Sequence, residues 1–270
     1  MRGSRPSMTK PRVVCVDDEP SFADLTATHL ERTAAVSAEG YTDPRDALSA
    51  IEDADDVRCV VSDYDMPAMN GLAFLDAVRE RHPDLPFVLF TGKGSEQVAS
   101  EAISMGVTEY LQKSTAASQY EVLGNRVENA IERYEAECAL AEQRELVDRI
   151  VEATPVAIVV HDADGDVEVA NERARELLSM DVDSLHLRSY DSSDWSLYAA
   201  SGERLPEAEL PVARVLDTGE TMRAETFVVA VDGRRTEVAL NAEPLVGDDG
   251  AIDRVVVVFA PTADFDGVPG

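Results

Sequence analysis

The chain has 270 residues, and its 53 Asp and Glu against 24 Lys and Arg give a formal net charge of −29 and a pI near 4.3. Such a charge disfavours contact with nucleic acid and anionic membranes, and no apolar run reaches the ~18 residues of a membrane span. No DNA or membrane partner is therefore expected, and the predicted location is cytoplasmic. The hydrophobic content of 44% excludes a disordered acidic chain, and the length leaves room for two domains.

Four short apolar runs in the first half of the chain predict β-strands. Each run ends at a residue that phosphoryl chemistry can use: Arg12–Val16 at Asp17 and Asp18, Arg58–Ser62 at Asp63, Phe87–Phe90 at Thr91, and Glu109–Gln112 at Lys113. Segments with helical spacing lie between the runs, which predicts a doubly wound α/β domain with a parallel sheet. The carboxyl ends of parallel strands meet at one edge of the sheet, so these residues are expected to lie close together.

The residue types predict the chemistry of that edge. Three crowded carboxylates, those of Asp17, Asp18 and Asp63, repel one another unless a cation neutralises them, and Mg²⁺ suits oxygen ligands of this kind. The hydroxyl of Thr91 and the ammonium of Lys113 can contact oxygens of a phosphoryl group on Asp63.

Residues 12 to about 120 resemble the receiver domain of two-component response regulators. The motifs are Asp17-Asp18-Glu19-Pro20, Asp63-Tyr64-Asp65-Met66-Pro67, Asn70-Gly71, Thr91-Gly92, and Tyr110 before Lys113. The resemblance implies a flavodoxin-like sheet of five parallel strands and a sensor histidine kinase as partner. It also implies site roles: phosphoacceptor Asp63, contacts from Thr91 and Lys113, a switch pair Thr91 and Tyr110, and Mg²⁺ held by Asp17, Asp18, Asp63 and the Asp65 carbonyl. Ser114 replaces the family's usual proline after the lysine, so a trans bond is expected there.

The segment from Ala117 to Ala153 predicts a long helix, with residues 121–150 as an interdomain linker. It contains no proline, and its apolar positions step by four, three, four and three, as in a heptad seam: Val127, Ile131, Tyr134, Cys138 and Ala141. The seam shifts phase before Leu146 and Ile150. This pattern predicts a parallel homodimer through residues 123–150. The alternative is an amphipathic helix that packs on its own domains.

Residues 151–262 are predicted to form a second domain, of the α+β class. Residues 1–11 and 263–270 are expected to be terminal tails. Strands are expected at Val156–Val160, Val167–Ala170, Arg223–Val231, Arg235–Ala242 and Val255–Phe259, and helices at Asn171–Leu178 and Pro206–Leu216. This order of two strands, helices and three antiparallel strands resembles a PAS domain.

No cofactor is predicted for the PAS-like domain. His161 and His186 could ligate haem, but a lone histidine is more often a core or surface residue, and no cysteine follows Cys138 for flavin photochemistry. Trp195 and Tyr198, expected in a variable helical segment, either line a small pocket or belong to the core. The three cysteines lack a metal-binding spacing and are expected to be free thiols.

The sequence predicts a signalling switch rather than a metabolic enzyme. It shows no kinase catalytic domain, no histidine on the linker helix and no basic helix-turn-helix. In the first hypothesis, Asp63 accepts a phosphoryl group and the helix signals to a PAS-like protein-interaction module. In the alternative, the PAS-like domain senses a small molecule and tunes receiver phosphorylation, which makes the chain a regulated phosphate sink.

The basic residues are almost all arginine, since only Lys10, Lys93 and Lys113 are lysine. A carboxylate-rich, lysine-poor surface resembles proteins of salt-accumulating halophilic archaea, where salt screens the repulsion. We therefore interpret the acidic charge as an adaptation to a haloarchaeal solvent.

Overall fold

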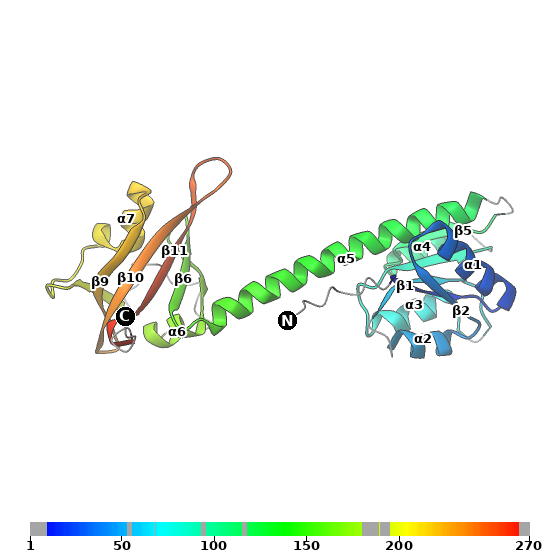
Figure 1. The fold of residues 1–270 in the computed structure, drawn as a ribbon, viewed down its shortest axis with the longest axis horizontal. Coiled ribbons are helices and arrows are strands. Elements are labelled where there is room, and N and C mark those ends of the chain that lie inside the picture. Colours follow the sequence, from blue (N-terminus) through cyan, green and yellow to red (C-terminus); the bar gives the residue numbers. More distant parts are fainter. Residues whose placement is uncertain are drawn as a thin grey trace, which may run out of the picture. The chain divides into compact units, whose positions relative to one another are not determined.

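A computed structural model describes residues 10–52, 56–67, 69–92, 96–114, 118–179, 189 and 195–264. The chain forms two compact units, Met1–Glu142 and Gln143–Gly270 (Figure 1). His186, the leader before residue 10 and most of the 263–270 tail lie outside the described residues.

The first unit contains the predicted parallel sheet of five strands. Its order is β2-β1-β3-β4-β5, and the strands are β1 (Arg12–Val16), β2 (Ser37–Tyr41), β3 (Val57–Ser62), β4 (Phe87–Thr91) and β5 (Glu109–Gln112). The chain moves from β1 outward to β2 and then crosses to β3 on the other side of β1. The direction of winding therefore reverses between β1 and β3, which is where doubly wound sheets bind ligands.

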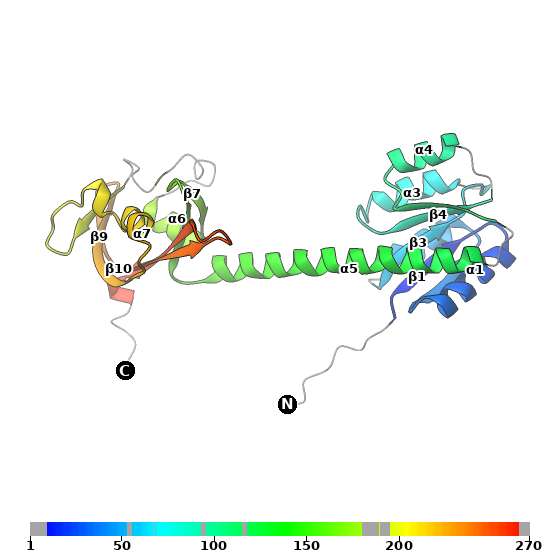
Figure 2. The ribbon, with the colours of Figure 1, turned by 90° about the horizontal axis from the view of Figure 1, so that it is seen from above.

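Helices cover both faces of this sheet. The helix α1 (Pro20–Thr33) and the start of α5 (Ser118–Ala153) pack on one face, while α2 (Pro44–Glu52), α3 (Gly71–Arg79) and α4 (Glu96–Ser104) pack on the other (Figure 2). Alternate residues of β1 point to opposite faces, so Val13 belongs to one core and Val14 to the other. This two-sided burial explains why the central strands are continuously apolar.

Strand β2 was not among the four apolar runs, because it is an edge strand of mixed composition. Its sequence, SAEGY, is only partly buried. Arg12 on β1 binds Glu39 at 2.6 Å and the Tyr41 hydroxyl at 3.2 Å, so polar side chains help to hold this edge.

Helix α5 spans the predicted segment, but its first half packs into the core of the first unit. Val127 and Ile131 are buried among residues of the sheet and α1, and Tyr134 packs against the core on the other face. The prediction that Ile131 faces a second copy is therefore wrong, because its own domain covers it. Apolar side chains farther along α5 are exposed: Leu140, Leu146, Val147 and Ile150.

The second unit contains an antiparallel sheet of order β7-β6-β11-β10-β9-β8. Its elements are β6 (Ala157–Asp162), β7 (Val167–Ala170), α6 (Glu172–Leu178), β8 (Trp195–Ala199), η2 (Glu207–Glu209), α7 (Pro211–Thr218), β9 (Met222–Val231), β10 (Arg234–Val246), β11 (Ile252–Pro261) and η3 (Thr262–Asp264). Residues of α6 and α7 share one hydrophobic core with the sheet. The predicted α+β class is confirmed, whereas Trp195 and Tyr198 lie on a strand instead of a helix. Pairing with β9 decides this, because β8 completes the edge of the sheet.

Two tight turns explain the strand register of this unit. The Asp162 carboxylate accepts bonds from the Asp164 and Asp166 amides, which closes the turn between β6 and β7. Asp232 and Gly233 both have positive φ, at 50° and 78°, as a two-residue hairpin loop between β9 and β10 requires.

None of the helices among the described residues combines the length and the apolarity that crossing a bilayer requires. Cys15, Cys59 and Cys138 are free thiols, and burial raises the pKa of both Cys15 and Cys59.

Candidate functional site

A cleft lies at the carboxyl ends of the parallel strands, where the winding reverses. Its lining includes Asp17 after β1, Asp63 after β3, Thr91 at the end of β4 and Lys113 after β5. Asp18, Asp65, Ser114, Gln119 and Tyr120 complete its polar lining, together with Glu19. Strand topology thus brings residues from four separate segments into one place.

Lys113 is the charge at the centre of the cleft. Its Nζ donates to Asp17 Oδ2 at 2.6 Å and to Asp63 Oδ1 at 2.7 Å, while Asp17 and Asp63 are only 5% and 8% exposed. One ammonium is therefore shared by two carboxylates in a largely buried site, where an unpaired charge would be costly.

Two phenyl rings also surround the Lys113 ammonium. Its nitrogen lies 5.2 Å from the Phe22 ring centre and 5.8 Å from that of Phe90. Burial lowers the pKa of Lys113, but the bonds to Asp17 and Asp63 outweigh this effect, so the net pKa is raised. The lysine is consequently a permanent cation near neutral pH.

The position of the Asp63 carboxylate is fixed by its own loop. Asp63 Oδ2 accepts from the Asp65 amide at 2.7 Å. Gly71 donates its N–H to the Tyr64 carbonyl at 2.9 Å, and a Cβ at Gly71 would overlap the Asp63 carbonyl oxygen. Asn70 caps α3 through the Ala73 amide at 2.8 Å, so the Asn70-Gly71 pair sets the start of α3 against the Asp63 loop.

Thr91 and Tyr110 lie on the neighbouring strands β4 and β5. Thr91 is buried in the cleft lining, and Tyr110 pairs in register with Leu89 and packs against the core formed with α2, α3 and α4. The Tyr110 hydroxyl is buried and has no hydrogen-bond partner among the described residues. A buried hydroxyl without a partner is unfavourable by ~1–3 kcal/mol, so a rearrangement that satisfied it would be favoured.

The carboxylate and carbonyl oxygens of the cleft are of the kind that bind a hard cation. In the present arrangement, however, the described residues contain no group of three Asp, Glu, His or Cys side chains close enough together to hold a metal ion. Lys113 and backbone amides already bind the oxygens of Asp17 and Asp63, and Glu19 N donates to Asp17 Oδ1 at 3.0 Å. The Asp18 side chain is exposed and lines the cleft. Carboxylate oxygens have more than one lone pair, so these groups can still accept Mg²⁺.

The peptide bond between Lys113 and Ser114 is trans, since the described residues contain no cis peptide bond. The Ser114 amide donates to the Gln119 side chain, which lies in the first turn of α5. A proline at 114 would lack this donor.

A second cavity, of about 60 Å³, lies inside the PAS-like unit. Its lining is apolar apart from His161 on β6 and the indole of Trp195 on β8. His161 Nδ1 lies 3.0 Å from the Gly165 carbonyl, so Nδ1 carries the proton. Burial lowers the pKa of His161, against weaker opposite effects of the Gly165 carbonyl, Asp162 and Asp166. The cavity can hold only a very small molecule.

Comparison with protein families matches both units. Residues 13–123 match the family model described as response regulator receiver domain, and residues 151–266 match the PAS fold.

Similar proteins include the C4-dicarboxylate transport transcriptional regulatory protein DctD of Rhizobium meliloti, 25% identical over 91% of this chain and 48% of its own length. The cyclic di-GMP phosphodiesterase response regulator RpfG of Xanthomonas campestris is 36% identical over 37% of this chain and 27% of its own length. A crystal structure of the chemotaxis protein CheY4 of Vibrio cholerae is 26% identical, with 44% of this chain and 99% of that chain covered at a TM-score of 0.41. The chain spans about half or less of the length of these curated relatives.

The cleft geometry predicts that Asp18 is the carboxylate most available to a cation. Asp18→Ala should weaken Mg²⁺ binding to the full chain by about tenfold or more while the fold is kept, because Asp17 is already held by Lys113 and Glu19. Calorimetric Mg²⁺ titration measures this, with Asp24→Ala on α1 as a control that removes an acid outside the cleft. Equal Mg²⁺ affinity of Asp18→Ala and wild type would contradict the prediction.

Proposed function

We infer that this chain, a response regulator receiver domain followed by a PAS domain, accepts a phosphoryl group on Asp63 from a sensor histidine kinase and signals to its PAS domain through α5. One observation carries this proposal: Lys113 bridges the buried carboxylates of Asp17 and Asp63 in a cleft at the point where the winding reverses.

The proposed reaction follows from the groups in the cleft. A carboxylate oxygen of Asp63 attacks the phosphorus of a phosphohistidine, the P–N bond breaks, and the imidazole leaves with its electron pair and takes up a proton. Asp63 loses its negative charge in the acyl phosphate, while the phosphoryl oxygens bring new negative charge. Lys113, already at hydrogen-bond distance from Asp63, is placed to neutralise those oxygens, and the Thr91 hydroxyl in the lining can donate to them.

Asp17, Asp18, Asp63 and the Asp65 carbonyl are the groups that would hold Mg²⁺ in this proposal. The ion would supply positive charge to the phosphoryl oxygens when bound. The protein residues orient the Asp63 carboxylate and exclude water on the side of the buried Asp17. Apart from this phosphoryl transfer to Asp63 and the hydrolysis of the acyl phosphate to Asp63 and inorganic phosphate, we propose no enzymatic activity.

The phosphoacceptor assignment predicts that Asp63→Asn abolishes labelling. With Mg²⁺ and acetyl phosphate, wild type should gain one acid-labile phosphate, and Asp63→Asn should lose about 100-fold or more of the labelling rate, because an amide is a poor nucleophile. Intact-mass spectrometry measures the product. Asp76→Asn, an exposed change on α3, is the control, and a labelled Asp63→Asn would refute the assignment.

The switch pair is proposed to link the cleft to the rest of the domain. Thr91 would move toward the phosphoryl group, and Tyr110 would follow into the space vacated. The buried Tyr110 hydroxyl supports this, since no hydrogen-bond partner for it lies among the described residues and a rearrangement could satisfy it.

The size of the PAS cavity favours the protein-interaction hypothesis over the small-molecule sensor. At about 60 Å³, the cavity has space for a few atoms only. One observation still supports the alternative: His161 is 4% exposed and borders the cavity, so its unprotonated Nε2 could accept a bond from a small donor. Native mass spectrometry of the full chain tests this, because a copurifying small molecule would favour the sensor hypothesis.

A homodimer through α5 is also proposed, with a seam different from the one predicted. Leu146 and Ile150 are 58% and 57% exposed and four residues apart, so they share one face of the helix. A second α5 could cover this face, while Val127 and Ile131 stay in the receiver core.

This seam predicts that Leu146→Glu raises the dissociation constant of the dimer by about tenfold or more, since two like charges would meet in the seam. Light scattering in high salt measures the mass. Ala141→Glu is the matched control, because it adds the same charge on the opposite side of the helix. A monomeric wild type at micromolar concentration, or dissociation by Ala141→Glu alone, would rule out this seam.

The acidic composition is proposed to be an adaptation to concentrated salt, as in haloarchaeal proteins. A net charge of −29 destabilises the compact state unless it is screened. The free energy of unfolding should therefore rise by on the order of 1 kcal/mol or more between about 0.15 M and about 2 M KCl. Denaturant titrations measure it, with sucrose of equal osmolarity as the uncharged control. No increase with KCl beyond that in sucrose would remove this interpretation.

A further inference from the structure

The end of α5 and the start of α6 are joined by the side chain of Asn171. This residue is fully buried, at 0% exposure, and precedes α6 as its N-cap. Its Oδ1 accepts from the amides of Ile158 at 2.9 Å and Ala174 at 3.0 Å. Its Nδ2 donates to the carbonyls of Val151 at 3.0 Å and Val156 at 2.9 Å. Every hydrogen-bonding position of the amide is thus occupied.

These bonds reach three separate elements. Val151 lies in the last turn of α5, where carbonyls have no partner within the helix, so Asn171 caps the carboxyl end of α5 as well as the amino end of α6. Ile158 lies on β6, and the backbone of Asn171 also donates to the Ile158 carbonyl at 3.0 Å. The end of α5 is therefore fixed to β6 and α6 together.

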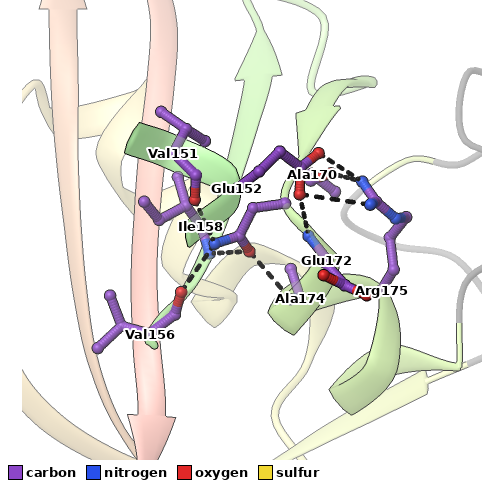
Figure 3. Close-up of polar contacts among 9 residues, drawn as sticks. Val151, Glu152, Val156, Ile158, Ala170, Glu172, Ala174 and Arg175 are labelled. Carbon is purple, nitrogen blue, oxygen red and sulfur yellow. Dashed lines mark hydrogen bonds and ion pairs between the residues drawn. The ribbon is translucent and has the colours of Figure 1, made fainter. Parts of the chain in front are cut away.

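Glu152 on α5 makes the reverse connection. Its Oε2 accepts from the Glu172 amide, in the first turn of α6, at 2.7 Å, and its carboxylate pairs with Arg175 at 3.2 Å (Figure 3). Arg175 also donates to the Ala170 carbonyl. Desolvation raises the pKa of Glu152, but the bonds from the Glu172 amide and Arg175 outweigh it, so the pKa is lowered. Each helix thus supplies a capping group to the other.

We propose that this reciprocal cap, formed by Asn171, Glu152 and Arg175, is the joint that converts a displacement of α5 into a change of the PAS core. The two elements tied to it, β6 and α6, carry Val159, His161 and Leu178, which border the PAS cavity. A rotation or shift of the last turn of α5 would break its bonds to α6 and to Asn171, and Asn171 is itself hydrogen-bonded to Ile158 on β6. This inference rests on the proposed phosphorylation switch, which would supply the displacement.

Trp195 provides a reporter for the test. It is the single tryptophan of the chain, it is buried, and it lines the same cavity. Its fluorescence should change when acetyl phosphate and Mg²⁺ phosphorylate the full-length wild type. Glu152→Ala removes an exposed side chain and should keep the fold and the phosphate incorporation, but reduce the Trp195 response by about fivefold or more.

Glu145→Ala is the matched control. It breaks the exposed Glu145–Arg149 pair two turns earlier on the same side of α5, without touching the joint. It should keep the full Trp195 response. Asn171→Asp, which replaces the two N–H donors, should abolish the response if it folds. An unchanged response in Glu152→Ala, or an equal loss in Glu145→Ala, would overturn the proposal.

A second measurement separates this proposal from the phosphorylation switch. In the unphosphorylated chain, Glu152→Ala should speed hydrogen exchange of amides in the last turn of α5 and the first turn of α6 together, by about tenfold, and Glu145→Ala should not. Unchanged exchange would overturn the joint. Phosphate incorporation without any Trp195 response in wild type would overturn the coupling while the receiver function stands. A wild type that takes up no phosphate would instead refute the proposed function, and the exchange result would then decide the joint alone.

Discussion

The ion pairs of Lys113 are the interaction on which the cleft depends. The carboxylates of Asp17 and Asp63, which follow different strands, both accept a hydrogen bond from the Lys113 ammonium, and both are buried. Without Lys113 the two carboxylates would face each other with no cation between them, so the lysine offsets their mutual repulsion. The sheet topology makes this contact possible, because the ends of β1, β3 and β5 meet at one edge.

Charge and hydrogen bonding serve different purposes in the two units. In the receiver, oppositely charged groups meet in a cleft, where Asp63 is one of the two carboxylates that accept hydrogen bonds from Lys113. At the PAS end of α5, a neutral amide is saturated with hydrogen bonds and surrounded by backbone. The contacts in the cleft depend on the charges of the side chains, whereas those of Asn171 depend on the positions of backbone groups.

The sequence predicted the cleft well, because strand ends are readable from short apolar runs and parallel topology brings them together. Strand β2 was not predicted, because a partly exposed edge strand contains few apolar residues. The burial of Ile131 could not be read either, because the apolar stripe of a helix does not reveal whether its own domain or a second copy covers it. Asn171 was expected only as the first residue of a helix, because its partners on α5 and β6 depend on the tertiary structure. The same holds for Trp195, whose strand forms only by pairing with β9.

The distribution of the thiols has a practical consequence. Cys15 and Cys59 are buried in the receiver core with raised pKa values, so they stay protonated and shielded from electrophiles. Cys138 lies partly exposed on α5, near the end of the first unit. A thiol-reactive dye or spin label should therefore attach at this one position of the unaltered protein. Cys138 therefore offers a native labelling site on α5 for spectroscopy.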